Sequence, residues 1–102
     1  MMKAVWNNTV VAEATDDELI KIEGNWYFPP DSLHEKYFSD SSLETECIWK
    51  GTAHYYDIVV DGEKNEGAAW YYPEPKEGST KLAKSDFKDY VAFWRGVEVV
   101  EG

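Results

Sequence analysis

The sequence contains very little of the two residue types that most often build metal and redox sites. Among its 102 residues there are one cysteine, Cys47, and two histidines, His34 and His54. One cysteine cannot form an internal disulfide bond or a multi-cysteine zinc site, and this usage is typical of a reducing compartment. Two histidines exclude a histidine-rich metal centre. We therefore expect no metal site and no cofactor.

Long apolar segments are also missing. The residues from Met1 to Trp6 have no apolar core of signal-peptide length, and no apolar run approaches the roughly 20 residues that span a membrane. There is no phosphate-binding glycine loop, no His-x-Glu motif and no nucleophile elbow. These absences predict a cytoplasmic protein that does not enter a membrane, and they leave its status as an enzyme open.

Positive charge is scarce. The chain has ten Lys and Arg residues but twenty Asp and Glu residues, and its formal net charge at pH 7 is −10. Such a charge repels a phosphate backbone, so we expect no nucleic-acid partner. We expect a small molecule as the partner. Lys, Glu and Pro at the edges of the strands favour a monomer or a weak homodimer.

Aromatic residues are abundant, at 16% of the total, and short apolar segments alternate with turn signals. This pattern is typical of a mainly β fold, a sandwich or small barrel of short antiparallel strands with one or two short helices. The length fits a single domain over residues 1–102. We expect strands at residues 5–6, 9–14, 18–23, 26–28, 43–49, 52–60, 68–72, 90–94 and 97–100.

Local signals predict the turns, the helices and one loop. Asn7-Asn8 and Asp61-Gly62 tolerate the positive φ angles of two-residue hairpin turns, and Lys50-Gly51 is expected to turn in the same way. Ser32, with a glutamate three residues later, matches a capping box and predicts a helix of one or two turns. Residues 79–88 have room for a short helix. The polar residues 39–42 are expected to form a loop.

The segment from Cys47 to Tyr56 is the densest in reactive groups. If Lys50-Gly51 is a two-residue turn, Cys47 lies opposite His54, with Cβ atoms about 5 Å apart. A thiol and an imidazole at that distance can share a proton, and the charge of Lys50 favours a thiolate, which would make Cys47 a nucleophile with His54 as its base. One alternative is a buried structural thiol, because a shift of one residue in register sends the two side chains to opposite faces. The other is a thiol that contacts a ligand without reacting.

Lys50 also suggests a binding site. Its ammonium is suited to hold an anionic or carbonyl group, and the nearby aromatic side chains are suited to line a pocket, although each of them could equally belong to the core. Three hypotheses follow: a small-ligand-binding domain, a transferase or thiol-type enzyme that uses Cys47, and a protein-interaction module with exposed aromatic residues. The expected ligand-binding residues are Tyr27, Trp49, Lys50, Tyr55 and Trp70.

Four ordered motifs carry a resemblance to a known family. They are Tyr27-Phe28-Pro29-Pro30, Cys47-x-Trp49-Lys50-Gly51-x-Ala53-x-Tyr55, Ala68-Ala69-Trp70-Tyr71-Tyr72-Pro73 and Tyr90-Val91-Ala92-Phe93. Together they resemble the domain-of-unknown-function 427 family, which is sometimes labelled nucleotidyltransferase, over nearly the whole chain. No phosphate loop or metal-binding carboxylate group accompanies that label here.

The resemblance implies a β-tent fold, similar to that of methionine-R-sulfoxide reductases and of the thalidomide-binding domain of cereblon. Those relatives usually carry a four-cysteine zinc site. Because this chain has a single cysteine, the metal and the reductase chemistry do not carry over. The family motif does not restrict position 54 to histidine, which weakens the case for a Cys47–His54 pair.

Overall fold

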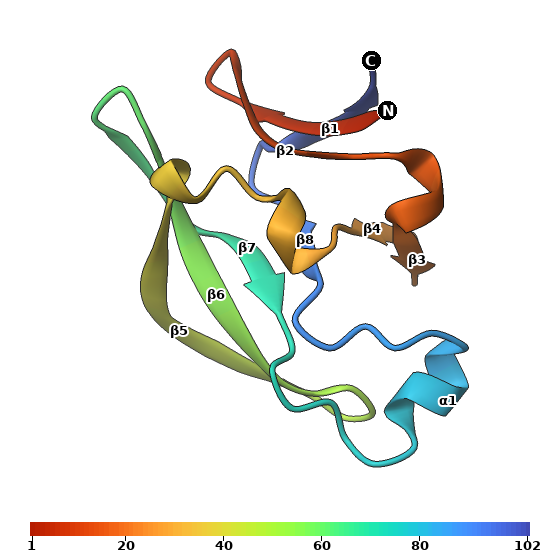
Figure 1. Ribbon diagram of the computed structural model, residues 1–102. Coiled ribbons are helices and arrows are strands. Elements are labelled where there is room, and N and C mark those ends of the chain that lie inside the picture. Colours follow the sequence, from red (N-terminus) through yellow and green to blue (C-terminus); the bar gives the residue numbers. More distant parts are fainter.

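The computed structural model describes residues 1–102 and contains three antiparallel sheets (Figure 1). Their strand orders are β2-β1-β9, β3-β4 and β5-β6-β7-β8, so no sheet closes into a barrel. The predicted mainly β fold with little helix is confirmed. The strands are β1 (Met2–Trp6), β2 (Thr9–Ala14), β3 (Ile20–Ile22), β4 (Asn25–Tyr27), β5 (Phe38–Cys47), β6 (Gly51–Val60), β7 (Glu63–Tyr71), β8 (Val91–Phe93) and β9 (Glu98–Glu101).

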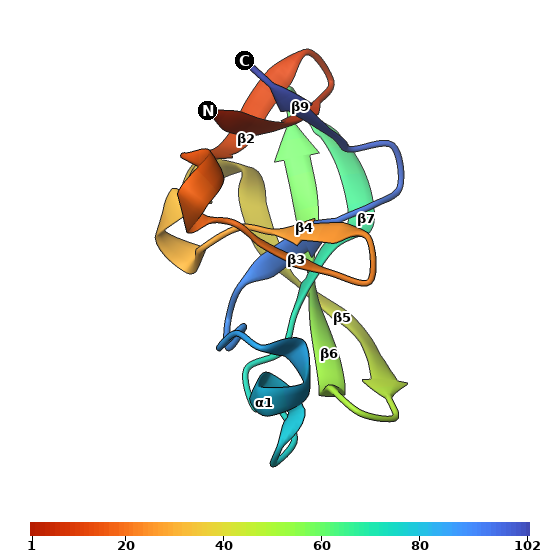
Figure 2. The same cartoon turned by 90° about the vertical axis from the view of Figure 1, so that its right-hand side faces the viewer.

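Helical structure is short. The helix α1 (Ser79–Ala83) lies within the predicted segment, and three single 3-10 turns cover Asp16–Glu18, Pro30–Ser32 and Glu35–Tyr37. In Figure 2 the β2-β1-β9 sheet and α1 lie at opposite ends of the molecule, with β3 and β4 between them. No helix combines the length and the apolar character needed to cross a membrane.

Two hairpins form as their turn residues predict. Trp6 pairs with Thr9 across Asn7-Asn8, and Val60 pairs with Glu63 across Asp61-Gly62. All four turn residues have positive φ, between 50° and 79°. Asn, Asp and Gly adopt this left-handed backbone at little cost, so these turns are determined by the local sequence.

Strand β7 is longer than predicted. It begins at Glu63 rather than at Ala68, because the Asp61-Gly62 turn places the polar residues 63–66 directly against β6. Backbone pairing across a tight turn needs no apolar side chains. Strand β3 is shorter than predicted, since residues 16–18 form a 3-10 turn, closed where Glu18 accepts hydrogen bonds from the N–H and hydroxyl of Thr15.

The predicted helix at Ser32 is wrong. The hydroxyl of Ser32 donates to the carbonyl of Pro29 at 2.6 Å, which closes a 3-10 turn instead of capping an α-helix. The next residues are extended, and the His34 N–H donates to the carbonyl of Val11 at 2.8 Å. This bond to β2 interrupts the segment before a helix can propagate.

Residues 39–42 do not form the predicted loop. They belong to β5, where Asp40 pairs with Tyr56 and Glu44 pairs with His54. Three residues of β5 therefore oppose one residue of β6, which makes a wide bulge in the sheet. The polar residues thus form a β-bulge within β5 instead of a loop.

The side chains form two hydrophobic clusters. The first cluster lies between the β2-β1-β9 sheet and one end of β6, and its twelve buried members are Met2, Ala4, Val11, Ala12, Ala14, Phe28, Ile58, Val60, Ala68, Ala69, Val91 and Phe93. The second cluster lies toward the other end of β6, and its seven buried members are Ile22, Tyr27, Ala53, Tyr55, Tyr72, Phe87 and Ala92. Burying one such large apolar side chain contributes about 1.5–3 kcal/mol.

Candidate functional site

The turn between β5 and β6 contains three residues, Ile48, Trp49 and Lys50, where two were predicted. Gly51 closes it with φ +117°, and a Cβ atom at this position would lie 3.1 Å from the carbonyl oxygen of Glu74. The N–H of Lys76 donates to the carbonyl of Lys50 at 2.9 Å. Glycine therefore lets the segment after β7 pack directly against the turn.

The predicted pairing of Cys47 with His54 is wrong. Cys47 lies opposite Gly51, and Glu44 lies opposite His54. Because side chains alternate along a strand, Cys47 and His54 occupy opposite faces of the sheet. His54 Nδ1 is 3.8 Å from the Glu44 carboxylate, whereas the half-buried Cys47 packs on the second cluster. The partner of Cys47 moves by three residues, from His54 to Gly51, and because three is an odd number the two side chains lie on opposite faces, so the geometry supplies no base for the thiol.

Lys50 is the central residue of the candidate site. Only 6% of its side chain is exposed, and its Nζ lies 5.2 Å from the ring centroid of Trp49 and 5.4 Å from that of Tyr72. Both distances are in the range of cation–π attraction. The ammonium donates a hydrogen bond to the carboxylate of Glu23, whose side chain is 54% exposed. A buried cation is thus paired with a partner at the surface.

The ionisation of this pair follows from its surroundings. Burial acts to lower the pKa of Lys50, but the hydrogen bond to Glu23 and the negative charge of Glu23 outweigh it, so that the pKa is raised. The hydrogen bond from Lys50 is the main cause that lowers the pKa of Glu23, and the indole N–H of Trp49 adds to it. Both groups are therefore charged at neutral pH.

Glu23 is held at the tip of a hairpin. Ile22 pairs with Asn25, so Glu23 and Gly24 form a two-residue turn with φ angles of 53° and 83°. Positive φ is uncommon for a glutamate. The turn directs this side chain toward Lys50, 27 residues away in sequence.

The aromatic side chains near Lys50 form a continuous series of rings. Trp49 contacts Phe87 at 6.3 Å between ring centroids, Phe87 contacts Tyr27 at 6.5 Å, and Tyr27 contacts Trp70 at 6.2 Å. The Trp70 indole N–H also donates to the Tyr27 hydroxyl at 3.2 Å. Burial is the main cause that raises the pKa of Tyr27, so its hydroxyl stays protonated. These rings and Lys50 belong to one packed unit.

Tyr55 lies at the far end of this series. Its ring is 6.1 Å from that of Trp94, which in turn lies 5.7 Å from Trp70. The Tyr55 hydroxyl shares a 2.8 Å hydrogen bond with the hydroxyl of Thr45. The structure thus places Tyr27, Trp49 and Trp70 nearer to Lys50 along the series than Tyr55. Whether any of the five binds a ligand stays a prediction.

Sequence reasoning missed three residues of this site. Tyr72 flanks Lys50, and burial is the main cause that raises its pKa. Phe87 is fully buried between Tyr27, Trp49 and Tyr72, although it follows α1 in a segment with little apolar periodicity. For Glu23, the adjoining Gly24 signalled a turn, but nothing local indicated the distant lysine.

Four surface pockets open elsewhere on the molecule. None of them is lined by the five predicted ligand-binding residues, whereas His54 lines one together with Glu44 and Glu74. No group of three or more His, Cys, Asp or Glu side chains is arranged to hold a metal ion. The Glu23 carboxylate is bonded to the Lys50 ammonium, and none of the four pockets is lined by Lys50.

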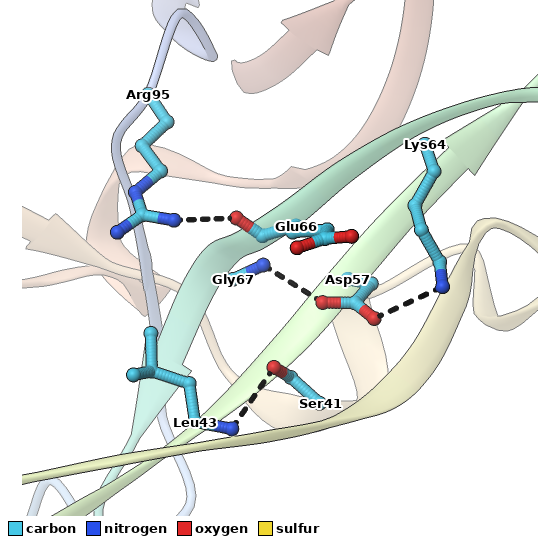
Figure 3. A network of polar contacts seen from close by, with 7 residues as sticks. All are labelled: Ser41, Leu43, Asp57, Lys64, Glu66, Gly67 and Arg95. Carbon is cyan, nitrogen blue, oxygen red and sulfur yellow. Dashed lines mark hydrogen bonds and ion pairs between the residues drawn. The ribbon is translucent and has the colours of Figure 1, made fainter.

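One of these pockets, about 580 Å³ in volume, lies at the bulges of β5, β6 and β7 (Figure 3). The buried Asp57 accepts a hydrogen bond from the Gly67 N–H at 2.8 Å and lies 3.7 Å from Lys64 Nζ. Arg95 donates to the carbonyl of Glu66 at 2.8 Å. These contacts satisfy backbone groups that the bulges remove from the ladder, so we interpret the network as structural.

Comparison with known proteins gives one positive result. A search of curated proteins found no match to this chain. A family model described as "Domain of unknown function (DUF427)" matches residues 1–101, all but the last residue. The match agrees with the resemblance carried by the four motifs, and the motif around Trp49 and Lys50 forms the turn at the centre of the candidate site. The chain therefore belongs to the domain-of-unknown-function 427 family.

Proposed function

We propose that this domain binds a small ligand with an anionic or carbonyl group, and that Lys50 holds that group. The supporting observation is the asymmetry of the ion pair, in which the cation is 6% exposed and its carboxylate partner is 54% exposed. A buried charge costs several kcal/mol unless it is paired, so a lysine retained here needs a reason beyond stability. Exchange of the accessible partner for a ligand supplies that reason.

The surroundings of Lys50 suit such a ligand. The rings of Trp49 and Tyr72 both lie within cation–π distance of the ammonium, and Phe87 packs against both rings. Small-molecule sites combine apolar walls of this kind with a few placed polar groups. Lys50 supplies the charge, and the rings supply the apolar contact.

The test compares Lys50→Met with wild type. Methionine keeps the unbranched stem and removes the charge, and the variant should still fold, because the Glu23 carboxylate that it leaves unpaired is 54% exposed to solvent. Acetate, benzoate, benzamide and phosphate serve as probes, with binding followed by NMR chemical shifts. We expect wild type to bind at least one probe and Lys50→Met to bind none.

Lys76→Met is the matched control. Lys76 adjoins the same turn, where its Nζ donates to the carbonyl of Ile48 at 2.8 Å, but it is exposed and outside the second cluster. We expect this variant to bind as wild type does. Equal binding by wild type and Lys50→Met would contradict the proposed function.

A further inference from the structure

We propose that Glu23 is an internal occupant of the Lys50 site, which a ligand carboxylate displaces. This inference rests on the proposed function and narrows it from anionic or carbonyl-bearing compounds to carboxylates. Glu23 places a carboxylate on the ammonium of Lys50, beside the indole of Trp49. In this position it satisfies the site when no ligand is bound.

Glu23 is free to leave because little else depends on its side chain. It projects from a two-residue turn, and the hairpin is held by the pairing of Ile22 with Asn25 and of Ile20 with Tyr27, which does not involve the carboxylate. No neighbouring atom lies within 4 Å of the place where a Cβ of Gly24 would sit, so the tip borders open space. Rotation of the Glu23 side chain toward solvent breaks one ion pair and no strand pairing.

Lys50, by contrast, is fixed. Its carbonyl accepts the N–H of Lys76, and its ammonium lies against the rings of Trp49 and Tyr72. When the Glu23 side chain rotates toward solvent, the Lys50 ammonium stays buried and has no anionic partner. Because a buried ammonium needs a negatively charged partner, another carboxylate restores the pairing and a neutral carbonyl does not.

The donor also matches a carboxylate. Lys50 donates a hydrogen bond to one oxygen of the Glu23 carboxylate, and a carboxylate has a second oxygen that accepts hydrogen bonds. The organic part of the ligand would extend along the Trp49 ring toward the surface, where the Glu23 side chain now lies. A monocarboxylate with a flat apolar body satisfies both features.

The experiment measures the affinity of benzoate and of its neutral isostere benzamide for wild type and Glu23→Gln by calorimetry. Glutamine keeps the size of Glu23 and removes its charge. An ion pair with one partner at the surface, if it is as strong as ordinary surface pairs, corresponds to a gain of about fivefold in benzoate affinity when the internal competitor is weakened. We expect that gain for benzoate and no gain for benzamide.

Two further variants strengthen the design. Glu63→Gln removes the same charge from an exposed position at the start of β7, and it should bind benzoate as wild type does. This variant controls for the overall charge of −10. Glu23→Asn serves if Glu23→Gln folds poorly, because asparagine tolerates the positive φ of this turn. We expect it to show the same gain.

The outcomes separate this inference from the proposed function. Benzoate binding that is lost in Lys50→Met but unchanged in Glu23→Gln would overturn displacement and keep the function. Benzamide binding as tightly as benzoate would overturn the carboxylate class alone. Absence of benzoate binding to wild type and to both Glu23 variants at millimolar concentration would overturn the inference, and the other probes would then decide the function.

Discussion

The two hydrophobic clusters differ in what they bury. Every member of the first cluster has a wholly apolar side chain, and the cluster is made of small and aliphatic residues with two phenylalanines. Among the seven buried members of the second cluster, Tyr27, Tyr55 and Tyr72 carry hydroxyl groups, and Lys50 and Cys47 lie beside them. The buried members of the first cluster need only shape and apolar area, and its hydroxyl groups are confined to partly buried tyrosines at its margin, Tyr37, Tyr56 and Tyr71. The second keeps polar groups that apolar residues of similar size could replace.

This difference indicates a division of labour within one small domain. Polar groups in a core weaken it unless each finds a partner, so they persist where they serve something other than stability. The only ion pair that joins a buried cation to a distant turn lies beside the second cluster. The first cluster holds the sheets together, and the second is the place to look for chemistry.

The largest expected effect on stability comes from truncating one large side chain in each cluster. Phe28 and Phe87 are both fully buried, and replacing either by alanine should cost about 3–5 kcal/mol of unfolding free energy. We expect Phe28→Ala, in the first cluster, to leave benzoate affinity unchanged in the folded fraction. Phe87→Ala should lower both stability and affinity, because Phe87 packs against the rings beside Lys50.

Urea denaturation and benzoate titration of the same samples provide the measurement. Leu82→Ala is the control, since this side chain is exposed on α1 and should alter neither quantity. A loss of benzoate affinity in Phe28→Ala as large as that in Phe87→Ala would contradict the division between the clusters.

A smaller effect is expected in the acid dependence of stability. The hydrogen bond from Lys50 lowers the pKa of Glu23 from its ordinary 4.5, so the unfolded chain binds more protons than the folded protein near that pH. The stabilising contribution is present above the unfolded pKa and is lost as the pH falls through the folded pKa. Glu23→Gln should therefore lose less stability than wild type between neutral pH and roughly pH 3, by about 1 kcal/mol or less.

Thermal unfolding at several pH values measures this difference. Lys50→Met should show the same shallower acid dependence, because it removes the other half of the pair. An acid dependence that is equally steep in wild type and in both variants would show that the pair contributes nothing to folding.

The smallest effect is expected at Cys47. The half-buried thiol has no imidazole beside it, so iodoacetamide should react more slowly with the folded protein than with the unfolded chain. We expect Lys50→Met to leave the rate in the folded protein unchanged within about twofold. A fast reaction in the folded state that Lys50→Met slows strongly would instead favour the thiol-type enzyme, and with it a catalytic role for the second cluster.

The sequence predicted those features that depend on neighbouring residues. Asn7-Asn8 and Asp61-Gly62 turn as expected, because positive φ is a property of the residues themselves. The helix at Ser32 failed because a hydrogen bond from His34 to Val11 on another strand decides the backbone there. Hydrogen bonds between segments that are distant in sequence cannot be predicted from a local sequence pattern.

The candidate site shows the same limit. The motif around Trp49 and Lys50 correctly indicated that aromatic rings gather near a lysine. Its register was wrong because the turn lies at residues 48–50 instead of 50–51, which moves the pairing by three residues and reverses which side chains share a face. Glu23 could not be identified from the sequence, since only the folded chain brings its turn to Lys50.

The separate two-stranded sheet has a consequence for how the domain moves. Strands β3 and β4 have three residues each and form a sheet only with one another, although Phe28, directly after β4, is bridged to Val91 of β8, whereas β6 is paired on both sides along most of its length. Amide protons protected only by such a short ladder exchange with solvent through local opening, and those of a central strand wait for global unfolding. Tyr27 is buried and Phe28 is bonded to β8, so we expect this local opening at the Glu23-Gly24 tip of the hairpin while the central sheet stays closed.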